Sequence, residues 1–304
     1  MMRGPKLQSI AVRTKTGIVT TTEPLKLTKD RYKVAGWPFI RGVINFGSSM
    51  ACGVRALMYS ANLQVAEITN TDAETPETPD IPAEPPQPET PETAKKKSAS
   101  DAFAVTIAVI LGIGLSVVLF MLLPTFLAGF VTGFTDSRIV KNLIEGVIRI
   151  AIFIGYIGLS SLMSDMKRVW MYHGAEHKTI FCYERELPLT VENARAQPRC
   201  HPRCGTSFMF IVMIVSILVF SVMSWRGVFL RIVTRLALLP VVVAVSYEII
   251  KWAGRHDNVA TRIISAPGKA LQRLTTREPD DEMLEVAIAA ITLVLPEEKG
   301  ADEW

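Results

Sequence analysis

Residues 103–130 read FAVTIAVILGIGLSVVLFMLLPTFLAGF and contain no charged side chain. A helix needs about 20 predominantly apolar residues to cross the hydrocarbon core of a bilayer, whereas apolar runs of about 10–14 residues are typical of buried helices in soluble proteins. The stretch is therefore long enough to span a membrane, and we predict a transmembrane helix here.

Three further apolar runs follow, at residues 140–163, 207–224 and 228–252. Each is near or above the length that a membrane span needs. The chain of 304 residues is 49% hydrophobic and has a positive mean hydropathy of +0.28, as is typical of membrane proteins. The alternative, a large soluble core with buried helices, fits these run lengths less well. We therefore predict a mainly α, polytopic helical membrane protein with about four transmembrane helices in residues 101–255.

The N-terminal region, residues 1–69, precedes the spans. Residues 8–22 are rich in β-branched side chains that alternate around a Lys-Thr-Gly turn, which is typical of a small β-hairpin. Residues 36–64 place apolar side chains at helical spacing, and Arg41 and Arg55 interrupt any continuous apolar run. Here we expect an amphipathic helix that lies at the membrane interface or packs on the bundle.

Two other segments differ from the spans in composition. Residues 70–100 consist mainly of Pro, Glu, Thr and Asp, with three lysines near the end. Such a segment cannot bury enough apolar surface to fold, so we predict a disordered linker. After the spans, residues 256–304 are predicted to form a C-terminal cytoplasmic segment with an amphipathic helix.

Basic residues near the ends of the spans predict the orientation of the chain. They gather at residues 95–97, in the loop at 164–205 and near Lys251, and positive flanks favour the cytoplasmic side. Arg138 and Arg226 lie on the opposite side and oppose this orientation without reversing it. We predict a multi-pass protein of the cell membrane, with this loop and both termini in the cytoplasm, where thiols stay reduced.

Ionisable residues interrupt two of the predicted spans. Glu145 and Arg149 are four positions apart in the second span, and Arg231 and Arg235 are four apart in the fourth. A charge at membrane depth is costly unless it is paired or hydrated. We expect Glu145 to meet an arginine across a helix interface, and Arg231 to extend to the headgroups without a functional role.

The loop at 164–205 holds the candidate site. Residues 172–184 read YHGAEHKTIFCYE, with His173 and His177 four positions apart, a spacing that puts both on one helix face, where they can bind one metal ion. Glu176 lies between them and could take the proton of a water molecule. The order H-x-x-E-H is the one found in inverzincin peptidases.

A second group follows at residues 200–208, which read CHPRCGTSF. His201 and Cys204 are ligand types that zinc accepts, so we predict that they join the same site. Glu248, near the cytoplasmic end of the fourth span, is a candidate acidic ligand at a long interval. It could instead pair with Lys251, three residues later on the helix.

Three alternatives remain open for these side chains. The metal could be catalytic, or zinc could be fully coordinated by protein and serve only to fold the loop. In the third alternative Cys204, at the start of the third span, is a nucleophile: the helix dipole favours its thiolate, and His201 assists it.

Six motifs along the chain are MMRGPK, PFIRGVINF, YHGAEHKTI, HPRCGTSF, SYEIIKWAG and LQRLTTREPDD. Together they resemble the YqhQ-like family of bacterial membrane proteins, which are described as predicted metal-dependent enzymes. The resemblance covers nearly the whole chain outside residues 70–100. It implies a metal site carried here by His173, Glu176, His177, His201 and Cys204. It implies no particular reaction.

We expect a divalent metal, and zinc matches histidine and cysteine ligands best. The expected function is a metal-dependent hydrolase at the cytoplasmic membrane face, with Glu176 as the general base and a peptide or a lipid-linked amide or ester as substrate. The alternative is a zinc-stabilised membrane scaffold or assembly factor without catalytic activity. Membrane lipids and an unidentified substrate or protein are the expected partners, and we expect no nucleic-acid partner.

Overall fold

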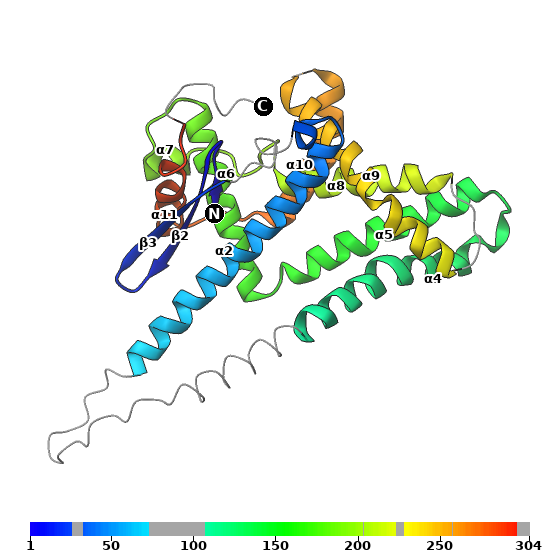
Figure 1. The fold of residues 1–304 in the computed structure, drawn as a ribbon, viewed down its shortest axis with the longest axis horizontal. Coiled ribbons are helices and arrows are strands. Elements are labelled where there is room, and N and C mark those ends of the chain that lie inside the picture. The colour runs from blue at the N-terminus through cyan, green and yellow to red at the C-terminus, as the bar shows by residue number, and fades with distance from the viewer. Residues whose placement is uncertain (26–32, 73–106, 203, 223–227, 257, 297–304) are drawn as a thin grey trace, which may run out of the picture.

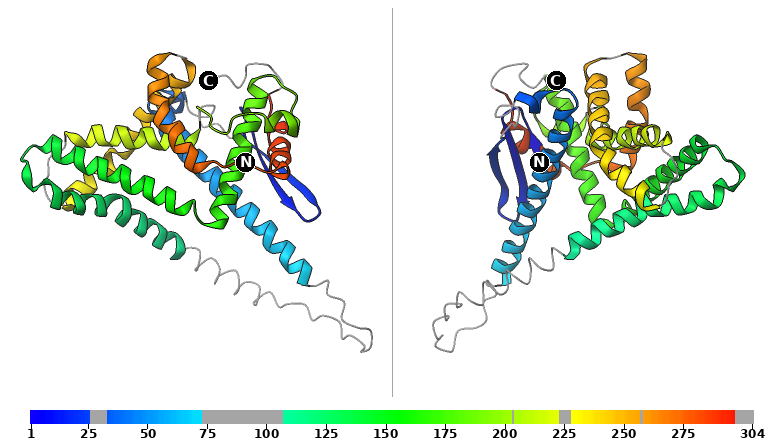
Figure 2. Two further views of the ribbon diagram at one scale, coloured as in Figure 1. Left: turned by 180° about the vertical axis from the view of Figure 1, so that it is seen from behind. Right: turned by 45° about the vertical axis from the view of Figure 1, so that its right-hand side comes forward.

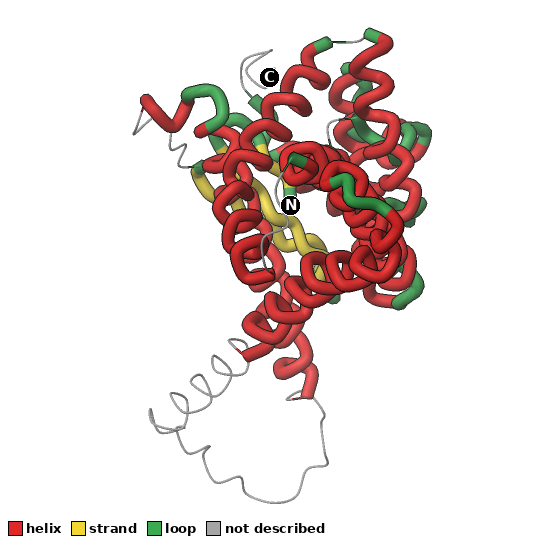
Figure 3. Tube along the Cα trace, turned by 90° about the vertical axis from the view of Figure 1, so that its right-hand side faces the viewer, coloured by secondary structure: helices red, strands yellow, loops and turns green. Residues whose placement is uncertain are grey.

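The structure is a computed structural model that describes residues 1–25, 33–72, 107–202, 204–222, 228–256 and 258–296 (Figure 1). Within these ranges the chain is mainly helical, and its strands form one small sheet near the N-terminus (Figure 3). The predicted linker, residues 70–100, lies almost wholly outside the described residues and stays a prediction.

The sheet has three antiparallel strands in the order β1, β2, β3, with bounds Met2–Arg3, Leu7–Thr14 and Gly17–Pro24. Thr14 pairs with Gly17, so a two-residue loop joins β2 to β3 and the predicted hairpin is confirmed. Gly17 has a φ of 142°, which glycine adopts without strain. Strand β1 was not predicted, because two residues are too few to display an alternating pattern.

Helix α2, Ile40–Asp72, contains most of the segment that was predicted to be an amphipathic helix. It packs against α9, Val228–Arg255. Gly42 lies so close to α9 that an added Cβ would be 2.7 Å from the Cβ of Tyr247. The side-chain amide of Asn45 donates a hydrogen bond to the hydroxyl of Tyr247 at 2.8 Å. These contacts fix the first part of α2 to the bundle.

Among the described residues, three helices are long and apolar enough to cross a membrane: Ile107–Val131, α5 (Arg138–Ser160) and the part Ile232–Arg255 of α9. The first contains a π-helical turn, η2 (Val118–Leu122), followed by α4 (Leu123–Val131). The predicted third span corresponds to α8, Gly205–Ser221, an apolar helix of only 17 residues. The membrane character of the chain is thus supported by three helices, and the number four is not confirmed.

Glu145 is buried between the spans and pairs with two arginines. Its Oε1 accepts hydrogen bonds from Arg149 on α5 at 2.9 Å and from Arg235 on α9 at 2.5 Å. The prediction that Glu145 meets an arginine across a helix interface is confirmed. The side chain of Arg231 lies outside the described part of the chain, so its predicted position stays untested.

A second packed unit surrounds α6, Ser164–Glu184. Helix α11, Asp281–Thr292, packs on α6 and on β2, and the core of this unit includes Leu284 and Ala175. Figure 2 shows the sheet, α11 and α6 together on one side of the molecule, with α4 and α5 on the other. Helix α10, Val259–Thr275, packs on α8 and links the unit to the spans. The remaining elements are η1 (Lys33–Gly36), η3 (Thr132–Phe134) and α7 (Val191–Arg195).

Candidate metal centre

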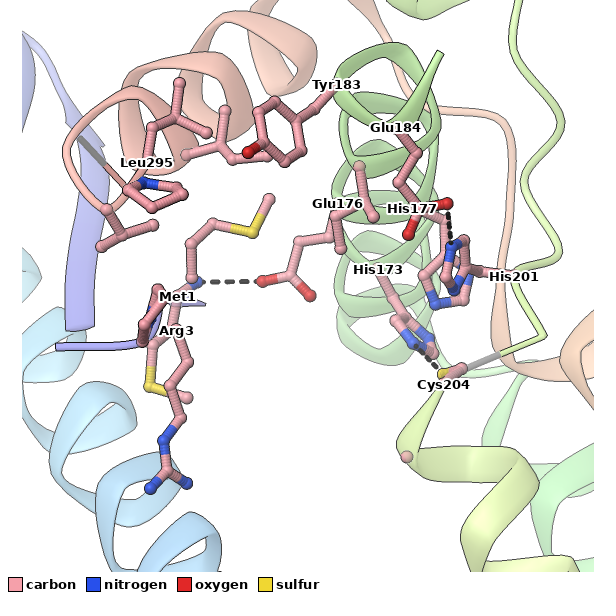
Figure 4. A pocket seen from close by; sticks show the side chains of 18 residues that line it. Met1, Arg3, His173, Glu176, His177, Tyr183, Glu184, His201, Cys204 and Leu295 are labelled. Atoms are coloured by element: carbon pink, nitrogen blue, oxygen red, sulfur yellow. Dashed lines mark hydrogen bonds and ion pairs between the residues drawn. The ribbon is translucent and has the colours of Figure 1, made fainter. Parts of the chain in front are cut away.

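Helix α6 carries the two predicted histidine ligands, one turn apart. The ring centroids of His173 and His177 are 4.4 Å apart, and both rings lie near Cys204 (Figure 4). Gly174 between them has a low helix propensity, and packing explains its presence: an added Cβ would be 2.1 Å from the carbonyl oxygen of Arg277. Without a side chain at this position, the segment after α10 can pass directly over α6.

Cys204 reaches the same point from the start of α8. It is the N-cap residue of α8, and its sulfur accepts a hydrogen bond from the backbone N–H of Thr206 at 3.5 Å. Nε2 of His173 lies 3.1 Å from this sulfur. One ligand atom each of His173, His177 and Cys204 lies within 4.8 Å of the others. Within the described residues, no other group of three or more His, Cys, Asp or Glu side chains meets that distance.

Backbone carbonyl groups orient both imidazole rings. Nδ1 of His173 donates a hydrogen bond to the carbonyl oxygen of Thr275 at 2.7 Å, and Nδ1 of His177 donates to that of Arg199 at 2.5 Å. A proton held on Nδ1 directs the lone pair of Nε2 to a metal ion, and such partners raise the basicity of the ligand. Both rings are therefore held in the orientation that a metal site requires.

Lys178, the neighbour of His177, holds the loop that provides one of these carbonyl groups. Its ammonium is buried and donates to the carbonyl oxygens of Arg195 and Gln197 at 2.9 and 2.8 Å. It also forms an ion pair with Glu278 at 2.9 Å. Lys178 was counted only as a basic flank of the spans, and no sequence pattern indicated this contact with main-chain atoms.

Without a bound metal, His173 and Cys204 form an imidazolium–thiolate pair. Burial raises the pKa of the Cys204 thiol, but the hydrogen bonds and charges of His173 and His177 outweigh it and lower the pKa to about 5. Burial lowers the pKa of His173, but the hydrogen bond and charge of Cys204 outweigh it and raise the pKa to about 8. The thiolate is the form that binds metal. The imidazole beside the sulfur is that of His173, whereas the nucleophile alternative assigned this place to His201.

The donor set fits zinc. Zn–N bonds of about 2.0–2.1 Å and Zn–S bonds of about 2.3 Å in a tetrahedral site put neighbouring ligand atoms about 3.5 Å apart. Nε2 of His173 and the sulfur of Cys204 are 3.1 Å apart, so an ion needs only a small adjustment of these side chains. Zinc held by two imidazole nitrogens and one thiolate would have one tetrahedral position left for a further ligand.

A pocket of about 410 Å³ adjoins the three candidate ligands and is lined on its other side by residues 1–5 (Figure 4). The carboxylate of Glu176 points into this pocket, where its Oε1 accepts a hydrogen bond from the amino group of Met1 at 3.0 Å. Glu176 therefore shares the pocket with the three ligands, but its carboxylate is directed toward Met1.

His201 lies beside the cluster and pairs with a glutamate. Its Nε2 is 3.1 Å from Oε2 of Glu184, and its ring contacts that of Phe181, with centroids 4.6 Å apart. The ring centroid is 5.9 Å from that of His177, and His201 is not one of the three clustered ligands. Sequence reasoning did not select Glu184, although it follows His177 by seven positions and therefore lies on the same face of α6.

Glu248 is held by a different contact. Its carboxylate accepts hydrogen bonds from Nε and Nη2 of Arg41 on α2, and from the backbone N–H of Phe39 at 3.3 Å. It neither lines the pocket nor belongs to the three-residue cluster. The structure thus gives Glu248 a place in the docking of α2 on α9.

Comparison with known proteins gives the chain a family. The model of a family described as "Protein of unknown function (DUF1385)" matches residues 37–297. The chain belongs to the DUF1385 family. The matched range contains all six candidate site residues, but the DUF1385 description names no activity, so the metal site that the resemblance implied stays a prediction.

One curated relative is the uncharacterized protein YqhQ of Bacillus subtilis (strain 168), which is 42% identical to this DUF1385 chain over 153 residues. The match covers 50% of the chain and 48% of the relative, so it spans about half the length of each protein. No solved structure matches the chain.

Proposed function

We propose that this DUF1385 protein is a membrane-embedded, metal-dependent hydrolase. One observation carries the proposal: ligand atoms of His173, His177 and Cys204 lie within 4.8 Å of one another and border a pocket of about 410 Å³. Catalytic zinc sites combine three protein ligands with an open position, whereas structural sites use four. The pocket would give a substrate access to the open side of the three ligands.

Zinc held by these residues would supply Lewis acidity, which polarises a carbonyl group and makes a water molecule more acidic. Glu176, in the same pocket, would accept the proton of the attacking water. Its carboxylate bonds to the amino group of Met1 at 3.0 Å, and its side chain is 32% exposed. A rotation of this exposed side chain would therefore precede the proton transfer.

The His201–Glu184 pair would provide the second proton transfer. Hydrolysis of an amide needs a proton donor for the leaving nitrogen as well as a base for the water. Both side chains line the pocket, and Nε2 of His201 is 3.1 Å from the Glu184 carboxylate. A neighbouring carboxylate orients an imidazole. His201 would thus donate a proton to the leaving group.

The reaction would take place at the cytoplasmic membrane face. Helix α8 has 17 residues, which is about 25 Å, and we propose that it also crosses, as the third of four spans, where the bilayer is slightly thinned. Four crossings put both termini on one side, and the basic flanks favour the cytoplasm. Cys204 lies at the start of α8, so a peptide or a lipid-linked amide or ester near that surface would reach the pocket.

The substitution Glu176→Gln tests the proposal. It keeps the volume and removes the base, so the variant should retain its metal and its thermal stability. Its ability to rescue a strain that lacks the gene should fall by a factor of about 10² or more. Glu192→Gln is the matched control, because Glu192 is exposed on α7 and does not line the pocket. Full rescue by Glu176→Gln would contradict a hydrolase with this base.

A zinc-stabilised scaffold is the second candidate, and one observation favours it. The cluster joins α6 to the start of α8, and His173 also contacts Thr275 at the end of α10. A metal at this point would fasten three segments that are distant in the sequence, which is the role of structural zinc. In this case Glu176→Gln should rescue fully, whereas loss of metal should lower the melting temperature and abolish rescue.

A further inference from the structure

A groove of about 580 Å³ lies among the membrane-spanning helices, apart from the candidate metal centre. Its walls come from the helix Ile107–Val131, from α8 and from α9, and most of the side chains that line it are apolar. Val109 and Ile113, on the first of these helices, are 54% and 62% exposed. The groove therefore opens sideways, toward the space that lipid chains would occupy.

Two arginines line one end of this groove. Arg149 and Arg235 both border it, and Glu145 lies behind them with hydrogen bonds to each. Among the ion pairs of the described residues, these two guanidinium groups and one carboxylate leave one positive charge in excess. The Arg235 side chain is only 5% exposed, and its Nε has no hydrogen-bond partner among the described residues. One donor of this buried cation is thus left without a partner among the described residues.

The position of Arg149 makes the excess charge costly. It lies 11 residues from either end of α5, which is Arg138–Ser160, and so about 16 Å from each end at 1.5 Å per residue. An unbalanced charge among apolar helices in the hydrocarbon region is expensive unless it is paired or hydrated. A bound anion would offset this cost.

Main-chain geometry holds Arg149 at the groove. Its Nε donates a hydrogen bond to the carbonyl oxygen of Phe120 at 3.1 Å, and Phe120 lies within the π-helical turn η2. A π-helical turn displaces carbonyl groups from the regular α-helical pattern, and such turns are frequent at functional sites. Phe120 itself lines the groove, so the turn shapes the wall and fixes the cation together.

We propose that this groove binds an anionic lipid, with its oxyanion at Arg149 and Arg235 and its apolar chain along the walls. The two arginines favour a ligand with an anionic group. The apolar lining and the lateral opening of the groove favour a ligand with a long hydrocarbon chain. The shared chemistry is a carboxylate or phosphate on an apolar chain, so a fatty acid and an acidic phospholipid are the two sources to compare.

The test uses the full-length protein in nanodiscs with equal amounts of phosphatidylglycerol and phosphatidylcholine, followed by native mass spectrometry of retained lipid. The wild type should retain phosphatidylglycerol in preference by about tenfold, and Arg149→Gln should abolish the preference. Arg138→Gln is the matched control, because Arg138 is exposed at the start of the same helix and does not line the groove. Equal effects of both substitutions, or no preference in the wild type, would overturn the proposal.

A second variant keeps all the charges. Gly112 lines the groove, and an added Cβ would meet no atom within 4 Å, so Gly112→Phe should fill the groove without disturbing the fold. It should reduce retention of phosphatidylglycerol and binding of oleate while the melting temperature stays unchanged.

A competition experiment with oleate separates the two sources. If oleate displaces phosphatidylglycerol from the wild type, a fatty acid can occupy the groove. If it does not, the groove is assigned to the phospholipid. Displacement by inorganic phosphate at the same concentration as oleate, or unchanged retention in Gly112→Phe, would contradict a lipid site.

Discussion

Nε2 of His173 lies 3.1 Å from the sulfur of Cys204, 31 positions later in the chain, while Nδ1 of the same ring donates to the carbonyl oxygen of Thr275, 102 positions later. One imidazole therefore connects α6, the start of α8 and the end of α10. A metal ion at the sulfur would replace the proton on Nε2, so binding should release protons.

The first prediction concerns pH in the metal-free protein. The pKa of Cys204 is lowered to about 5, so its thiolate contributes stability that is fully present above its ordinary pKa of 9.0 and is lost as the pH falls through 5. The pKa of His173 is raised to about 8, so its contribution is present below 6.5 and is lost as the pH rises through 8. The contribution of the pair should therefore be lost in acid, as the pH falls from 6.5 through 5.

The contribution of the His173–Cys204 pair is measured as the difference in melting temperature between the wild type and Cys204→Ser, with a chelator present. The difference should be clear at neutral pH and should shrink as the pH falls from 6.5 through 5. A difference that does not change with pH would mean that no ion pair forms between His173 and Cys204.

The second prediction concerns Gly174. Alanine would put its Cβ 2.1 Å from the carbonyl oxygen of Arg277, so the segment after α10 must move. Gly174→Ala should destabilise the protein by about 1–3 kcal/mol and weaken metal binding, because Thr275 moves with that segment. Gly155→Ala on α5 is the control, since a Cβ there meets nothing within 4 Å. Equal melting temperatures for both variants would refute the packing explanation.

The third prediction separates His201 from the ligands. The His201 ring is paired with Glu184, so His201→Ala should keep one metal ion per chain, whereas His177→Ala should lose most of it. The metal content of each purified variant, determined by elemental mass spectrometry, measures the difference. Loss of metal in His201→Ala would make His201 a fourth ligand and would favour a closed structural site.

The fourth prediction concerns orientation. In a background without native cysteines, a cysteine at Glu192 should be shielded from a membrane-impermeant thiol reagent in intact cells, and one at Ser137 should react. The basic flanks predict this pattern, and α5 begins directly after Ser137. The reverse labelling would place the candidate metal centre outside the cell.

Local patterns in the sequence predicted the parts of the molecule that depend on one segment. The apolar run at 103–130 predicted the first span, and the spacing of His173 and His177 predicted a shared helix face, because both signals repeat along a single helix. The third apolar run, at 207–224, likewise predicted most of α8, which spans Gly205–Ser221.

Contacts between distant segments could not be predicted in this way. The carbonyl groups of Thr275 and Arg199 orient the imidazoles, but a carbonyl group is present in every residue and carries no sequence signal. Glu248 resembled an acidic ligand, and only the docking of α2 on α9 pairs it with Arg41. Glu184 could have been found from the periodicity of α6 alone.

The central claim is that His173, His177 and Cys204 hold one metal ion with an open position, and cobalt(II) substitution tests it most directly. The purified protein should bind one cobalt ion per chain, with a sulfur-to-cobalt charge-transfer band that Cys204→Ser removes. Its d–d bands should indicate tetrahedral coordination and should shift when azide occupies the open position. A protein that binds no stoichiometric cobalt, or whose spectrum keeps the sulfur band in Cys204→Ser and ignores azide, would contradict the claim.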